Sequence, residues 1–189
     1  LLGLQQICSF EAQAAMALEG IASEAAASQA EAPTYRLPLR RSSETLLEWD
    51  WQPLLTAMLA DIADGAASAA AIALACHRAL AEAIAELGAH HHGTGGHEPG
   101  DDETRPPRAV LLGGGCFQNQ LLLELTVSAL RRRGLSPIWP QQLPCNDAAL
   151  AVGQLLALAP EPPPLHTPSD PLPQPRTLPI TSTAPRADR

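Results

Sequence analysis

The feature that most constrains the fold of this chain is an apolar run that ends in three consecutive glycines. Residues 110–112, V-L-L, precede the glycines at 113–115, and apolar residues at helical spacing follow over 119–133. Gly134 stops this helix, and residues 136–139 read as a second short strand. A strand, a glycine turn, a helix, a strand and a final helix over 147–158 predict an α/β fold.

The glycine turn also suggests chemistry. Backbone N–H groups in a glycine turn between a strand and a helix can approach a phosphate closely. A second motif, P-C-N-D-A-A-L-A-V-G-Q at 144–154, places Asp147 at the start of the last helix, where a carboxylate can hold a cation. On the residues alone a plainer interpretation stays open, because glycines form tight turns and Asn146 or Asp147 can simply cap a helix.

Composition excludes several classes of function. The net charge is −8, there is no Lys, and no basic face is interleaved with aromatic residues, so we expect no nucleic-acid partner. No apolar run is long enough to cross a membrane. The four cysteines are widely spaced without a C-x-x-C pair, which is typical of reduced thiols in a cytoplasmic protein.

The rest of the chain reads mainly as helix. Helical spacing predicts a helix at 7–30 with Met16 and Ile21 on its buried face, another at 53–63, and a third at 66–87 that is capped by Gly88. A short hairpin is expected from 34–39 and 45–49, and a buried strand over 108–112.

Two segments are expected to lack regular structure. Residues 89–107 combine H-H-H, G-T-G-G and D-D-E, which indicates a flexible insertion rather than a metal site. Proline dominates 159–189, so we expect a disordered tail after a folded region at 1–158. The chain starts L-L-G-L without an initiator Met, and we interpret it as a piece of a longer protein.

The motifs together resemble a known family. V-L-L-G-G-G-C-F-Q-N-Q-L-L-L-E-L followed by L-P-C-N-D-A-A-L-A-V-G-Q is similar to the end of the hydrogenase-maturation carbamoyltransferases, the HypF family. The usual wording there is close to S-G-G-V-F-Q-N-R-L-L-L-E and V-P-x-N-D-G-G-L-A-L-G-Q. The segment C-S-F-E-A-Q-A-A-M-A-L-E at 8–19 also resembles the family's S-Y-E-G-Q-A-A-x-x-L-E, and the resemblance extends over 1–158.

This resemblance implies a fold and an activity. The fold would be the second lobe of an actin- and sugar-kinase-like (ribonuclease-H-like) carbamoyltransferase domain, with a helical hairpin region. Family members use ATP to convert carbamoyl phosphate into carbamoyl adenylate, and they pass the carbamoyl group to the C-terminal Cys of a HypE acceptor protein. The product becomes the cyanide ligand of [NiFe] hydrogenase. Upstream domains of the same chain carry the adenylation, so this chain alone would be inactive.

The resemblance also implies roles for individual residues. Gly114 and Gly115 would contact phosphate through their backbones, and Asn119 would either cap the next helix or contact the nucleotide. Asp147 would bind a divalent metal, either Mg²⁺ or Zn²⁺ or Fe in a mixed His/Asp site. Glu11 and Gln13 match positions expected to line the nucleotide cleft.

Departures from the family pattern keep alternatives open. Ala12 replaces a glycine, Ala148 and Ala149 replace the two glycines after N-D, and the paired metal histidines would lie upstream. One alternative is an O-carbamoyltransferase or the tRNA threonylcarbamoyl enzyme of the same fold, although the F-Q-N wording argues against both. The other is a non-catalytic module that only docks a partner.

Overall fold

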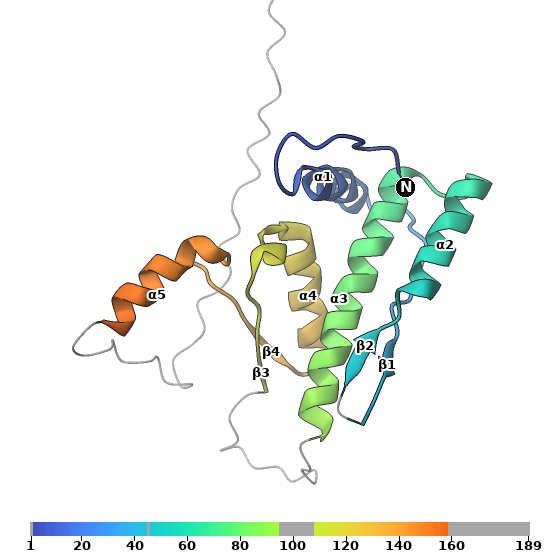
Figure 1. Ribbon diagram of the computed structural model, residues 1–189. Helices are drawn as coiled ribbons and strands as arrows, with labels where there is room; N and C mark the ends of the chain where they lie inside the picture. The colour runs from blue at the N-terminus through green and yellow to red at the C-terminus, as the bar shows by residue number, and fades with distance from the viewer. Residues whose placement is uncertain (1, 45, 95–107, 159–189) are drawn as a thin grey trace, which may run out of the picture.

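The computed structural model describes residues 2–44, 46–94 and 108–158, and the side chains of residues 92–94 are not described. Figure 1 shows the arrangement of its helices and strands. In chain order the elements are α1 (Gln13–Ala27), β1 (Leu39–Arg41), β2 (Leu47–Trp49), α2 (Trp51–Asp64), α3 (Ala69–Thr94), β3 (Ala109–Leu111), the 3₁₀ turn η1 (Gly115–Gln118), α4 (Gln120–Arg132), β4 (Ser136–Ile138), η2 (Asp147–Ala149) and α5 (Leu150–Ala157).

The long helix α3 is the centre of the fold (Figure 1). It packs against α1 and α4, and α2 and the β1–β2 hairpin also contact it. Alanines dominate the surface of α3 and allow this close approach, and Ile72 and Leu74 are almost fully buried on it. Separate apolar clusters join α3 to α2 and the hairpin, to α1, and to the segment from β3 to β4.

The strands β3 and β4 form a parallel pair that α4 connects. Ala109 pairs with Ser136, and Leu111 pairs with Ile138. A parallel pair needs a crossover, and the amphipathic α4 supplies it by burying Leu130 and Ala129 against the core. The predicted order of strand, glycine turn, helix and strand is confirmed here.

The end predicted for the third helix is wrong. The helix α3 continues through Gly88 to Thr94, so Gly88 is an interior residue and not a C-cap. A Cβ atom at Gly88 would lie 3.3 Å from side-chain atoms of Leu130 and Leu135, so the glycine permits close packing there. The expected insertion at 89–107 is therefore helical up to 94, and 95–107 lie outside the described residues, as does the tail from 159.

Several predicted boundaries shift for local reasons. The helix α1 begins at Gln13 rather than at residue 7, and Met16 is 58% exposed instead of buried. The helix α2 begins before Pro53, because Asp50 caps it by accepting a hydrogen bond from the N–H of Gln52.

The predicted hairpin forms, but its first strand is short. Only Leu39–Arg41 pairs with Leu47–Trp49, in antiparallel register. Tyr35, which precedes the strand, is buried, and its hydroxyl donates to Oδ2 of Asp61 at 2.7 Å. Burial and this carboxylate raise the pKa of Tyr35, so the phenol remains a neutral donor.

The strand predicted as buried over 108–112 is covered on only one side. Leu112 is buried, whereas Leu111 is 80% exposed. The helix α5 is also uncovered: it projects from the body in Figure 1, and Leu155 is 70% exposed. An apolar surface of this kind is typical of a part that packs against another domain.

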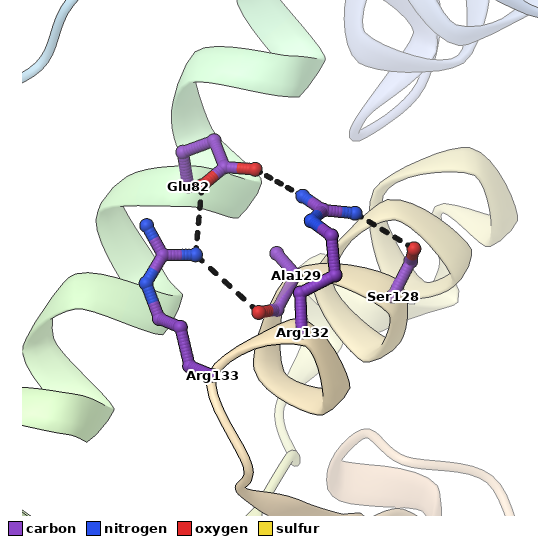
Figure 2. A network of polar contacts seen from close by, with 5 residues as sticks. All are labelled: Glu82, Ser128, Ala129, Arg132 and Arg133. Atoms are coloured by element: carbon purple, nitrogen blue, oxygen red, sulfur yellow. Dashed lines mark hydrogen bonds and ion pairs between the residues drawn. The ribbon is translucent and has the colours of Figure 1, made fainter.

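A polar cluster joins α3 to α4 on the surface. Figure 2 shows Glu82 of α3 between Arg132, the last residue of α4, and Arg133, which follows it. Glu82 forms ion pairs with both arginines, and Arg133 also donates to the carbonyl of Ala129. None of the helices in the described ranges combines the length and apolar character needed to cross a bilayer.

Candidate functional site

The glycine turn begins where β3 ends, and the N-D motif follows β4. These strands are neighbours and parallel, so both motifs lie at the same edge of the pair. The N–H of Gly114 donates to the carbonyl of Cys145 at 2.6 Å, which joins the two motifs directly. Gly114 has φ 94° and ψ 160°, a conformation open essentially to glycine alone.

The turn presents backbone donors. Within the described ranges the N–H groups of Gly113, Gly115 and Cys116 donate no hydrogen bond. Gly113, Gly114 and Gly115 are exposed, so these donors border solvent. Free N–H groups that lie close together in a turn suit an anion such as phosphate. Cys116, which follows the last glycine, is exposed as well.

Asp147 is the first residue of η2 and its side chain is exposed. Its neighbour Asn146 caps η2 by accepting from the N–H of Ala148 at 3.2 Å, so the capping role falls to Asn146 and not to Asp147. In the part of the chain that the structure describes, no three His, Cys, Asp or Glu side chains group into a metal site. Asp147 can therefore offer one ligand, and further ligands would have to come from elsewhere.

Asn119 caps α4, one of the two roles expected for it. Its Oδ1 accepts from the N–H of Leu122 at 2.7 Å. Its Nδ2 lies 2.9 Å from Nε2 of His77, whose Nδ1 lies 2.8 Å from the carbonyl of Ala73. Because a carbonyl can only accept, Nδ1 carries the proton and Nε2 accepts from Asn119. His77 is 4% exposed. His77 is therefore a buried residue that also links α3 to the start of α4 by a hydrogen bond.

Glu19 is a site residue that the sequence reasoning missed. Its Oε1 accepts from the N–H of Gln120 at 2.7 Å and lies 3.4 Å from the N–H of Leu121. The carboxylate of α1 thus sits on the amino end of α4. A signal was present in the sequence, because Glu19 closes the segment at 8–19 that resembles the family.

Glu11 and Gln13 lie just before and at the start of α1. Glu11 is exposed, and Oε1 of Gln13 accepts from the N–H of Ser9 at 2.7 Å. In the described residues neither side chain hydrogen-bonds to the glycine turn. Between them Ala12 has φ 63°, a left-handed conformation that favours glycine. The left-handed backbone at this position explains why the family pattern has a glycine there.

A cavity of ≈ 370 Å³ lies beside the two motifs. Phe117 and Gln118 come from the first motif, and Pro144 and Cys145 from the second. Its remaining lining residues follow the glycine turn or β4: Leu123, Trp139, Pro140 and Leu143.

Comparison with known proteins decides the family. Residues 1–154 match the model described as carbamoyltransferase, Kae1-like domain, second subdomain. The chain belongs to the HypF carbamoyltransferase family. It covers the C-terminal region of such proteins, and its fold is the second subdomain of the Kae1-like domain, as predicted.

Individual relatives agree with this placement. The chain is 36% identical over 157 residues to carbamoyltransferase HypF of Synechocystis sp., covering 83% of this chain and 18% of that protein. It is 35% identical over 168 residues to a HypF homolog of Cupriavidus necator, covering 85% of this chain and 38% of that one. The chain thus spans well under half the length of these relatives.

Solved structures show the same fold. A full-length HypF crystallised in the phosphate- and nucleotide-bound form superposes with a TM-score of 0.65 at 25% identity, covering 81% of this chain and 18% of that one. HypF of T. kodakarensis gives a TM-score of 0.63 at 23% identity, over 82% of this chain and 18% of that one, and supports the fold alone.

Proposed function

We propose that this chain forms one lobe of a HypF enzyme that makes the cyanide ligand of [NiFe] hydrogenase in the cytoplasm. The complete enzyme would use ATP and carbamoyl phosphate to form carbamoyl adenylate, and would transfer the carbamoyl group to the C-terminal Cys of a HypE-like acceptor. The observation that carries the proposal is the 2.6 Å hydrogen bond from Gly114 to Cys145, since it joins the two family motifs in one site.

The residues of this lobe would bind and orient rather than react. The free N–H groups of Gly113, Gly115 and Cys116 would hold phosphate oxygens of the nucleotide, as backbone donors do in other glycine turns. A full-length HypF similar to this chain was crystallised in a phosphate- and nucleotide-bound form, which supports phosphate and nucleotide binding by the complete enzyme. Asp147 would supply one oxygen ligand to a divalent metal, Mg²⁺, Zn²⁺ or Fe, which neutralises phosphate charge.

The rest of the site would come from the preceding domains. Glu11 and Gln13 would line the nucleotide cleft. Asn119 uses one amide hydrogen on His77, and its other amide hydrogen would contact the nucleotide. The exposed Leu111 and the exposed leucines of α5 lie on surfaces suited to packing against those domains.

The test joins this chain to the preceding domains of the Synechocystis relative. Carbamoyl-phosphate-dependent ATP–pyrophosphate exchange and carbamoyl transfer to HypE are then measured. An Asp147→Ala variant removes the metal ligand, and Asp64→Ala, an exposed carboxylate at the end of α2, is the matched control.

We expect exchange in every protein, because adenylation belongs to the upstream domains. Transfer should occur with the unaltered lobe and the Asp64 variant. It should fall by about 10–100-fold or more with Asp147→Ala, because losing even a residue that only orients a metal ligand costs about 10–100-fold. Exchange without transfer in all of them would contradict the proposal. It would favour a docking module, which Ala148 and Ala149 beside Asp147 suggest.

A further inference from the structure

The first N–H groups at the amino end of α4 already face acceptor atoms of the protein. The first N–H groups of a helix lack partners inside it and carry partial positive charge, so they usually bind anions when exposed. In this chain Glu19 accepts from Gln120 and approaches Leu121, and Asn119 accepts from Leu122. All of the first three donors of α4 therefore already face an oxygen atom of the protein.

Glu19 supplies a full negative charge at this end. A carboxylate that accepts backbone N–H bonds at a helix N-terminus is favoured by both charge and hydrogen bonding. Since Glu19 belongs to α1, the contact also fixes α1 against α4. Figure 1 shows α1 beside the end of α4 where this helix begins.

His77 holds Asn119, the second residue whose side chain accepts a hydrogen bond at the amino end of α4. It is buried on α3, its tautomer is set by Ala73, and its Nε2 holds the amide of Asn119. This contact orients the amide so that Oδ1 points to Leu122. Asn119 directly follows η1, so holding Asn119 also holds the end of the glycine turn.

We propose that Glu19 and His77 are positioning residues that close the amino end of α4 to phosphate. Phosphate is thereby directed to the N–H groups of Gly113, Gly115 and Cys116, which remain free. The inference rests on the proposed phosphate-binding role of the turn, but the closure of α4 can be tested separately.

The first test measures amide hydrogen exchange by NMR in the full 189-residue chain. In Glu19→Ala we expect Gln120 and Leu121 to exchange about tenfold faster or more, because each loses a charged acceptor. Glu19→Gln keeps an acceptor oxygen and should restore much of the protection. Glu24→Ala removes an exposed carboxylate from the same helix and should change neither amide.

A parallel pair tests His77. His77→Leu removes the acceptor for Asn119, so the amide of Leu122 should exchange several-fold faster. His77→Gln offers a carbonyl oxygen near the position of Nε2 and should restore protection. Faster exchange that Gln does not reverse would mean that His77 acts only by packing, and would overturn its positioning role.

The second test adds inorganic phosphate to the same proteins. In the unaltered chain the amide signals of Gly113 and Gly115 should shift, and those of Gln120 and Leu121 should not. In Glu19→Ala the signals of Gln120 and Leu121 should shift as well, because the amino end of α4 is then open.

The outcomes separate the two proposals. Phosphate shifts at Gln120 in the unaltered chain, or unchanged exchange in Glu19→Ala, would overturn the closure of α4. The expected exchange pattern without any phosphate shift at Gly113 or Gly115 would support the closure and contradict the phosphate role of the turn.

Discussion

Arg133 holds Glu82 from the end of the neighbouring helix: its Nη1 lies 2.7 Å from Oε2 of Glu82. Arg132 contacts the other carboxylate oxygen and is itself bound to Ser128. Partial burial alone would raise the pKa of Glu82, but the hydrogen bonds and charges of Arg133 and Arg132 lower it below its ordinary value. The stability that the cluster in Figure 2 contributes therefore depends on pH.

Glu82→Gln should reduce stability in a pH-dependent way. Because the folded-state pKa is lowered, the carboxylate stabilises the fold above the ordinary Glu pKa of about 4.3, and this contribution is lost as the pH falls below that value. Glu82 is 46% exposed and so screened, and we expect a loss of only about 0.5 kcal/mol at neutral pH. Denaturant unfolding at neutral pH and at acidic pH checks this; a difference that grows on acidification would contradict it.

Gly88→Val should destabilise the chain by about 1–3 kcal/mol, because the new side chain meets Leu130 and Leu135 where α3 and α4 pack. The control is Gly20→Ala on α1, where no atom lies within 4 Å of the added Cβ. That change should stabilise by about 0.5–1 kcal/mol through helix propensity. Thermal unfolding measures both, and equal signs would refute the explanation from packing.

Thr126→Val should raise the free energy of unfolding by about 1 kcal/mol. Thr126 is fully buried, and its hydroxyl finds no hydrogen-bond partner among the residues that the structure describes. The reverse change at the next position, Val127→Thr, should cost about 1–3 kcal/mol by burying a new hydroxyl. Urea unfolding of the two variants and the unaltered chain tests this prediction. A loss of stability in Thr126→Val would indicate that the hydroxyl does have a partner.

Ala12→Gly should stabilise the chain by about 0.5–1 kcal/mol. The left-handed conformation at φ 63° costs an L-residue about 1–2 kcal/mol, of which the greater freedom of unfolded glycine cancels a part. Ala14→Gly makes the same chemical change inside α1 and should destabilise by about 0.5–1 kcal/mol. Calorimetric Tm values that move in the same direction for both would rule out backbone strain at Ala12.

Local sequence patterns were sufficient to predict much of the fold. The glycines, the amphipathic spacing of α4 and Gly134 predict the strand–turn–helix–strand unit because they act within one element. The end of α3 was predicted too early, because a glycine after a helical pattern usually marks the end of the helix. Here the packing of Gly88 on Leu130 explains a glycine in the helix interior. Burial of Leu111 was overestimated because exposure depends on what else covers the strand pair.

In the candidate site, too, some features could be predicted from the sequence and others could not. The two motifs predicted that Gly114 and the N-D loop belong together, and the hydrogen bond to Cys145 agrees. The contacts of Glu19 and His77 with the start of α4 join residues far apart in sequence, about 100 and 42 positions. No spacing rule along the chain reports a contact of this kind, so only the three-dimensional packing reveals it.

The bond between Gly114 and Cys145 uses main-chain atoms at both ends. The amino acid at position 145 can therefore vary, because every amino acid has the same backbone carbonyl oxygen. Position 114 has no such freedom, because its φ of 94° admits essentially glycine. Homologous chains should accordingly vary at the accepting position while keeping the donor, and a cysteine at 145 says nothing about thiol chemistry.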